Sequence, residues 1–177
     1  MPDTARVRRS VASGDHRDPA NGKGLINPGG TFHRPTLLAS SADGFSRRAA
    51  DLERRVRVIG AGHPDELPGD DAVHLDFHPG NLLHADGRIT GVIDWDGAAR
   101  GDRRFDLVTL RFGLHAPGQR AAPGVVGRLD ALLDTVPADV LRPAWAHMGL
   151  RMTDWAIRHF PPDEVDHWLG LAERRLG

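Results

Sequence analysis

The sequence of 177 residues has no cysteine, and Lys23 is its only lysine. The absence of cysteine excludes disulfide bonds, thiolate nucleophiles and cysteine-ligated zinc. No stretch approaches the roughly 20 apolar residues that a membrane-spanning helix needs. Residues 1–10 also lack the apolar stretch of a secretory signal. We therefore expect a cytoplasmic protein that has no membrane partner.

The charges of the chain are almost balanced, with a formal net charge of -1. Proteins that bind the phosphate backbone of nucleic acids usually carry a basic excess, so we expect no nucleic-acid partner. Apolar residues make up 40% of the sequence, which fits a globular domain with a hydrophobic core.

Residues 1–36 are expected to form a poorly structured N-terminal segment, and residues 37–177 the folded domain. The first segment mixes Gly, Pro, Asp and Asn without apolar periodicity, which is typical of loops. Its Gly22-Lys23-Gly24 suggests a phosphate loop at first sight. However, the pattern G-x-x-x-x-G-K-[ST] is not met, because a glycine follows the lysine.

Apolar residues recur at helical spacing through most of the folded domain. The first predicted helix spans residues 42–58 and has Ser41 at its N-cap position. Four apolar residues of this helix share one face: Phe45, Ala49, Leu52 and Val56. Four more helices are predicted at residues 103–114, 125–136, 139–160 and 162–176. Short strands are predicted at residues 72–75, 82–85 and 88–93.

One segment, residues 74–96, has the side chains that phosphoryl transfer requires. That reaction needs a carboxylate to accept the proton of the attacking hydroxyl, and oxygen ligands for the Mg²⁺ that bridges the phosphates. The loop pattern H-x-D-x-x-x-x-N, followed by a metal-binding aspartate, supplies both. His74, Asp76 and Asn81 stand in this register. Asp94 is the second carboxylate.

A predicted hairpin explains how Asn81 and Asp94 meet. Asp86-Gly87 favours a type I′ turn, in which both central residues need a positive φ. Such a turn sets residue 81 opposite residue 92, so Asn81 and Asp94 leave the hairpin at the same end. We expect apolar residues on both strands to anchor this end in the core, beside the loop that holds Asp76.

The segment of residues 73–110 resembles the aminoglycoside phosphotransferase family, which includes choline-kinase-like enzymes. Three motifs carry the resemblance: His-Leu-Asp-Phe-His-Pro-Gly-Asn-Leu-Leu, Gly-Val-Ile-Asp-Trp-Asp and Gly-Asp-Arg-Arg-Phe-Asp-Leu. The resemblance implies an α+β fold, mainly α: the C-terminal lobe of a protein-kinase-like fold with a small catalytic β-hairpin. It also implies transfer of the γ-phosphoryl group of ATP to a hydroxyl of a small molecule, such as an aminoglycoside or an amino alcohol.

The resemblance assigns a role to each site residue. Asp76 would be the catalytic base, and Asn81 and Asp94 would bind Mg²⁺ and with it the ATP. His74 would brace the loop through hydrogen bonds, and Asp96 would support the metal site.

The chain departs from the family pattern in two places. Leu75 stands where the family often has glycine. Only about 70 residues precede His74, and Lys23 lies in a Gly-rich polar stretch rather than a strand. We therefore expect the N-terminal ATP lobe to be largely missing, or to be supplied by a separate chain. The alternative function is a truncated, non-catalytic remnant or binding module of the same family.

Three other patterns have two interpretations each. His74, Asp76 and His78 would share one face of a strand and suggest a metal-hydrolase cluster, but Pro79-Gly80 breaks the strand. The arginines at positions 47, 48, 54, 55 and 57 form either a solvated face or a contact to an acidic substrate. The acidic residues at 154, 163, 164 and 166 form either a solvated face or a contact to a cationic acceptor.

Overall fold

The structure, a computed structural model, describes residues 42–63 and 68–177. The expected N-terminal segment, residues 1–36, and the expected N-cap Ser41 lie outside the described residues. The helices are α1 (Ala42–Phe45), α2 (Arg47–Ala61), α3 (Arg104–Gly113), α4 (Val125–Leu133), α5 (Ala138–His159) and α6 (Pro162–Leu176). The strands are β1 (Asp71–Val73), β2 (Leu82–Ala85), β3 (Arg88–Val92) and β4 (Ala99–Gly101). Among the described residues, no helix is long and apolar enough to cross a membrane.

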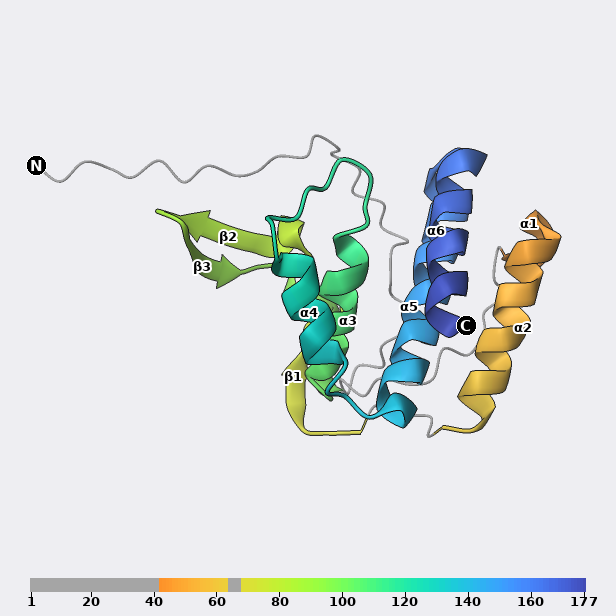
Figure 1. Ribbon diagram of the computed structural model, residues 1–177, viewed down its shortest axis with the longest axis horizontal. Coiled ribbons are helices and arrows are strands. Elements are labelled where there is room, and N and C mark those ends of the chain that lie inside the picture. The colour runs from red at the N-terminus through yellow and green to blue at the C-terminus, as the bar shows by residue number, and fades with distance from the viewer. Residues whose placement is uncertain (1–41, 64–67) are drawn as a thin grey trace, which may run out of the picture.

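Helices α2, α5 and α6 lie side by side, and α3 packs against α5 on the side away from α2 (Figure 1). Their buried faces form the core, which includes Leu52 of α2, Phe112 of α3, Met148 of α5 and Trp168 of α6. The strands form two separate antiparallel pairs, β1 with β4 and β2 with β3. The structure is therefore mainly helical with small sheets, in agreement with the expected fold class.

The close contact of α5 with α6 depends on a glycine. A Cβ atom added to Gly149 of α5 would lie 2.9 Å from the Cβ of Ala172 in α6. Real Cβ atoms do not approach a neighbour so closely, and both residues are buried, so a side chain at position 149 would push the two helices apart.

The prediction of one helix over residues 42–58 is wrong in its boundaries. Ser46 has an extended backbone (φ −158°) and its hydroxyl accepts a hydrogen bond from the amide of Ala49, 3.1 Å away. This is an N-cap, so α1 ends and a new helix, α2, begins and continues to Ala61. Phe45, on the α1 side of the break, is 39% exposed, whereas the other three predicted apolar residues of the face are buried.

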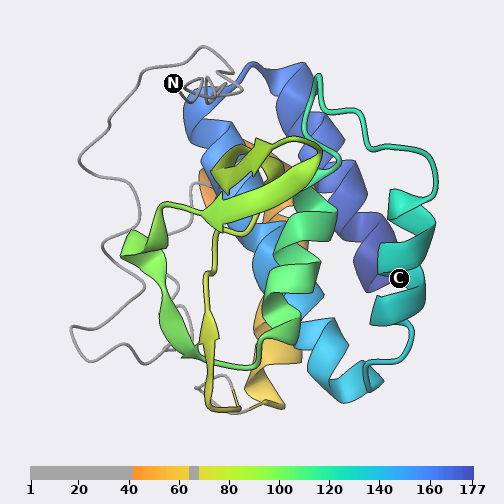
Figure 2. The same ribbon diagram turned by 90° about the vertical axis from the view of Figure 1, so that its left-hand side faces the viewer.

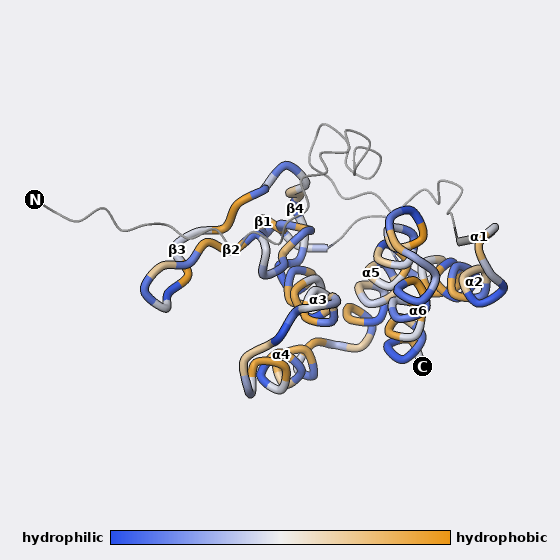
Figure 3. The backbone as a smooth tube through the Cα atoms, turned by 90° about the horizontal axis from the view of Figure 1, so that it is seen from above, coloured by the Kyte–Doolittle hydropathy of each residue, from blue (hydrophilic) through white to orange (hydrophobic). Residues whose placement is uncertain are grey.

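The β2–β3 hairpin projects away from the helices (Figure 1), and in Figure 2 it points toward the viewer in front of them. Its turn is confirmed: Asp86 and Gly87 have φ angles of 51° and 73°. The expected anchoring in the core is wrong, because no residue of the hairpin belongs to the core cluster and Ile93, at the end that was expected to be anchored, is 40% exposed. Figure 3 shows the hairpin with hydrophobic positions beside hydrophilic ones, well separated from the packed helices.

We predict that Gly149→Ala lowers the free energy of unfolding by about 1–2 kcal/mol, because overpacking at the α5–α6 contact outweighs the better helix propensity of alanine. Urea denaturation followed by circular dichroism measures this. The matched control is Gly127→Ala in α4, where nothing lies within 4 Å of an added Cβ. The control should raise the free energy of unfolding by up to about 1 kcal/mol. An equal gain in both variants would contradict the packing argument.

A second prediction concerns His147, whose ring lies edge-on to buried Phe105 at 5.3 Å between centroids. Burial, assisted by the charge of Arg151, lowers the pKa of His147 to about 3. The unfolded chain therefore binds more protons than the folded protein as the pH falls from about 6.5 toward 3. In that window His147 should reduce the free energy of unfolding by up to about 1.4 kcal/mol per pH unit.

Denaturation of His147→Gln at several pH values between 6.5 and 4 tests this. The variant should lose part of the pH slope that the unaltered protein shows. His84→Gln, at an exposed position of the hairpin, is the control and should keep the slope. The same slope in all three proteins would show that His147 does not contribute.

Candidate functional site

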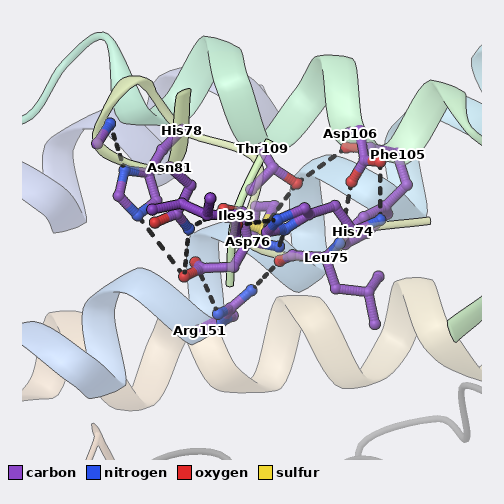
Figure 4. Close-up of polar contacts among 12 residues, drawn as sticks. His74, Leu75, Asp76, His78, Asn81, Ile93, Phe105, Asp106, Thr109 and Arg151 are labelled. Atoms are coloured by element: carbon purple, nitrogen blue, oxygen red, sulfur yellow. Dashed lines mark hydrogen bonds and ion pairs between the residues drawn. The ribbon is translucent and has the colours of Figure 1, made fainter. Parts of the chain in front are cut away.

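The loop between β1 and β2 is tied to the end of β3 by one buried histidine (Figure 4). The Nε2 of His74 donates to the carbonyl of Ile93 at 2.8 Å. Its Nδ1 accepts from the amide of Asp76 at 3.3 Å. Since one nitrogen donates and the other accepts, the ring is the neutral tautomer with its proton on Nε2. His74 thus links Asp76 to Ile93, the residue that precedes Asp94.

A carboxylate of α3 also holds this loop in place. Asp106, in the first turn of α3, accepts from the amide of His74 at 2.8 Å through one oxygen. Its other oxygen accepts from the amide of Leu75 at 3.0 Å. Burial raises the pKa of Asp106, while these two hydrogen bonds act in the opposite direction. One side chain therefore satisfies two consecutive backbone donors of the loop.

The backbone of Leu75 has a φ of 63°, in the left-handed region. This conformation costs a residue with a side chain about 1–2 kcal/mol, which explains why a glycine suits the position. Three contacts hold Leu75 there. Its amide donates to Asp106, its carbonyl accepts from Arg151 Nη1, and its side chain is buried in the core.

The carboxylate of Asp76 lies at the centre of the site and is 45% exposed (Figure 4). Its Oδ1 accepts from Nη2 of Arg151 at 3.1 Å. Its Oδ2 lies 3.6 Å from Nε2 of His78 and 3.5 Å from Nδ2 of Asn81. Burial acts to raise the pKa of Asp76, but His78 and the charge of Arg151 outweigh it and hold the pKa below its ordinary value. Asp76 is therefore ionised at neutral pH.

Asn81 is buried beside Asp76 and keeps one oxygen available. Its Nδ2 donates to the carbonyl of Asp76 at 2.9 Å. Within the described part of the chain, its Oδ1 makes no hydrogen bond. The backbone carbonyl of Asn81 accepts from the amide of Ile93 at 3.0 Å, so Asp94 follows directly at the same end of the hairpin.

This register differs by one residue from the prediction, which placed residue 92 opposite residue 81. Ala85 pairs with Arg88 next to the turn, and Leu82 pairs with Val92 at the other end. Between these two pairs β2 advances by three residues and β3 by four, so β3 contains one extra residue. The shift lies between Leu83 and His84 and is a β-bulge. Asn81 and Asp94 still lie at the same end of the hairpin, because the bulge moves the partner of Asn81 from residue 92 to residue 93.

Asp94 has a left-handed backbone (φ 66°, ψ 54°) at the start of a 3₁₀ turn that contains Asp96. Aspartate adopts this conformation more readily than most residues. Both carboxylates are exposed, and neither makes a hydrogen bond or ion pair with another described residue. They are therefore accessible to a ligand from solvent.

The oxygens of Asn81 and Asp94 fit a Mg²⁺ ion that arrives with phosphates. Mg²⁺ in such sites keeps one or two protein oxygen ligands and completes its octahedron with phosphate oxygens and water. Among residues 42–63 and 68–177, no group of three or more His, Asp or Glu side chains can hold a metal by itself.

The alternative metal-hydrolase cluster does not agree with the geometry. Both ring nitrogens of His74 are engaged, one by the carbonyl of Ile93 and one by the amide of Asp76. His78 also uses its Nδ1, which accepts from the amide of Gly80 at 3.1 Å. His74 consequently has no nitrogen left to bind a metal.

The basic face of α2 is largely ion-paired. Arg48 contacts Asp166 at 2.8 Å and Glu173 at 2.8 Å, both on α6. Arg54 and Arg57 pair with acidic residues of their own helix, Asp51 and Glu53. These pairs favour the interpretation as a solvated, helix-linking face over a contact to an acidic substrate.

Comparison with known proteins identifies a family and solved structures that this chain is similar to. A family model described as "APH: Phosphotransferase enzyme family" matches residues 31–133. Two solved structures match with a TM-score of 0.56 and 20% identity: aminoglycoside phosphotransferase APH(4)-Ia, and its thermostable mutant in ternary complex with ADP and hygromycin B. Each match covers 78% of this chain and 45% of the other. The chain thus spans less than half the length of these structures. No curated protein matches it.

We predict that Asp106→Asn lowers the free energy of unfolding by about 1–3 kcal/mol, because one buried loop amide loses its acceptor and faces a donor. Urea denaturation measures the loss. Asp86→Asn, the same change at an exposed turn position, should alter stability by less than about 0.5 kcal/mol. Equal stability of the two variants would rule out the supporting role of Asp106.

Proposed function

Because the chain belongs to the phosphotransferase enzyme family, we propose that it transfers the γ-phosphoryl group of ATP to a hydroxyl of a small molecule. The observation that carries the proposal is the shared end of the hairpin and loop. There the ionised carboxylate of Asp76 lies beside the side-chain amide of Asn81. Asp94 directly follows Ile93, whose backbone amide donates to the carbonyl of Asn81. These are the groups that such a transfer needs.

Asp76 is proposed as the catalytic base. Its carboxylate would accept a hydrogen bond from the acceptor hydroxyl and take the proton as the oxygen attacks the γ-phosphorus. Phosphoryl transfer has a loose transition state, so orientation of the hydroxyl matters more than a high basicity of the carboxylate. The low pKa of Asp76 is compatible with this role, because a carboxylate that stays ionised can orient the hydroxyl at neutral pH.

Asn81 and Asp94 are proposed as the ligands that hold Mg²⁺ with the ATP phosphates, supported by Asp96. The metal would neutralise charge on the phosphates. His74 would keep both ligands in place relative to Asp76, since it bonds to the loop and to the strand end. The use of an ATP-type nucleotide is supported by the matched phosphotransferase, which was solved with ADP.

A second candidate function is a non-catalytic binding module of the same family. The chain spans 45% of the length of the solved phosphotransferases, so turnover of the nucleotide by this chain needs its own test. The two candidates differ in whether the nucleotide is turned over.

We predict Mg²⁺-dependent binding of ATP, measured by titration calorimetry, that Asp94→Ala weakens by at least about tenfold because a metal ligand is lost. Asp76→Asn should bind ATP as the unaltered protein does. If turnover is detected as ADP release, Asp76→Asn should lower it by about 10²–10⁴-fold, the usual contribution of a general base.

The outcomes separate the candidates. Binding with turnover supports the enzyme, and binding without turnover supports the binding module. Absence of ATP binding in the presence of Mg²⁺ would contradict both. Full activity of Asp76→Asn would remove Asp76 as the base.

A further inference from the structure

Arg151, which no sequence pattern indicated, contacts the carboxylate proposed as the base. It lies on α5, and its side chain is 32% exposed. Nη1 donates to the carbonyl of Leu75, and Nη2 donates to Oδ1 of Asp76 at 3.1 Å. A guanidinium group has five N–H donors in one plane. In the described part of the chain two of them are used, so three are not engaged by another described residue.

The contacts of the Arg151 guanidinium hold it in place during a reaction. Its bond to the Leu75 carbonyl does not depend on Asp76, so a substrate hydroxyl that competes for the carboxylate leaves this anchor intact. The anchor also helps to hold Leu75 in its left-handed conformation. Arginine remains protonated at any physiological pH. Arg151 therefore places a permanent positive charge next to the atom that the acceptor hydroxyl must approach.

The acidic residues that α5 and α6 offer to a cationic acceptor are ion-paired with other arginines or stand at a helix start, and in the described part of the chain none of them forms an ion pair with Arg151. Asp154, one turn after Arg151, pairs with Arg158 at 2.6 Å. Asp166 pairs with Arg48. Asp163 and Glu164 occupy the first turn of α6, where acidic residues stabilise a helix through its dipole. Of the four acidic residues considered for a cationic acceptor, two are thus already ion-paired and two stand at a helix start that favours them.

We propose that the acceptor is a hydroxyl compound with an anionic group, and that Arg151 determines this specificity. The inference rests on the proposed function and narrows its substrate class. The spare donors of Arg151 bind the anionic group as a fork, which places the neighbouring hydroxyl against Asp76. In the transfer, the hydroxyl oxygen bonds to the γ-phosphorus, the bond to the β–γ bridging oxygen breaks, and Asp76 takes the proton. The products are ADP and an anionic phosphate ester.

Four probes with one three-carbon skeleton test the charge preference. Glycerate carries a carboxylate, glycerol 3-phosphate a phosphate, glycerol no charge, and 3-amino-1,2-propanediol a positive charge. Binding of each is measured by calorimetry or ligand-observed NMR on the full chain, without nucleotide. We expect at least one anionic probe to bind about 10–100-fold more tightly than glycerol, as for hydrogen bonds between charged groups. The cationic probe should bind most weakly. The two anionic probes distinguish a carboxylate from a phosphate.

Substitutions then assign the preference to Arg151. Arg151→Gln should remove the advantage of the anionic probe while the binding of glycerol changes little. Arg151→Lys retains the charge without the fork and should keep a reduced advantage, which covers the case that Arg151→Gln does not fold. Arg158→Gln, on the same helix, is the control and should leave the order unchanged. A residue that merely supported the loop would weaken all probes equally.

The proposal is overturned if the cationic probe binds most tightly, if no probe binds, or if the order survives in Arg151→Gln. These results are separate from the fate of the proposed function, which depends on Mg²⁺-dependent ATP binding. An anionic preference without ATP binding would leave the acceptor inference standing and refute phosphoryl transfer. ATP binding together with tightest binding of the cationic probe would leave the proposed phosphoryl transfer standing and refute the anionic acceptor.

Discussion

The site depends on the contact between Asp106 and the two amides of His74 and Leu75. These amides follow a strand of only three residues, β1, and Leu75 then takes a left-handed conformation that costs free energy. The carboxylate compensates by accepting both hydrogen bonds from the first turn of α3. Without it the loop would have two unsatisfied donors next to a strained residue. The direction in which Asp76 leaves the loop therefore rests on a side chain that lies thirty residues later in the chain.

A second constraint couples the loop to the hairpin. The hairpin is not part of the hydrophobic core, so packing alone does not position it. Its end is fixed instead by hydrogen bonds: the carbonyl of Ile93 accepts from His74, and the amide of Ile93 donates to Asn81. Directional hydrogen bonds replace apolar packing here, which holds the end with Asn81 and Asp94 in place and leaves it open to solvent. The exposed carboxylate of Asp94 illustrates the result.

The site carries acidic residues on the hairpin and a basic residue on α5. Asp94 and Asp96 stand on the hairpin side and suit a cation, whereas Arg151 stands on the side of α5 and suits an anion. Asp76 contacts Arg151, and His78 together with the charge of Arg151 holds its pKa below the ordinary value, against the effect of burial. The same guanidinium therefore binds the backbone of the loop at Leu75 and helps to lower the pKa of the central carboxylate.

The sequence by itself determined the local features. The Asp-Gly turn follows from residues that tolerate positive φ, the helices from apolar spacing, and the approach of Asn81 to Asp94 from the hairpin between them. Only the tertiary structure decided the rest. The bulge in the hairpin, the exposure of its strands and the role of Arg151 depend on contacts between residues far apart in the chain. Arg151 lies 75 positions from Asp76. Periodicity and spacing report on neighbours along the chain, and therefore carry no information about such contacts.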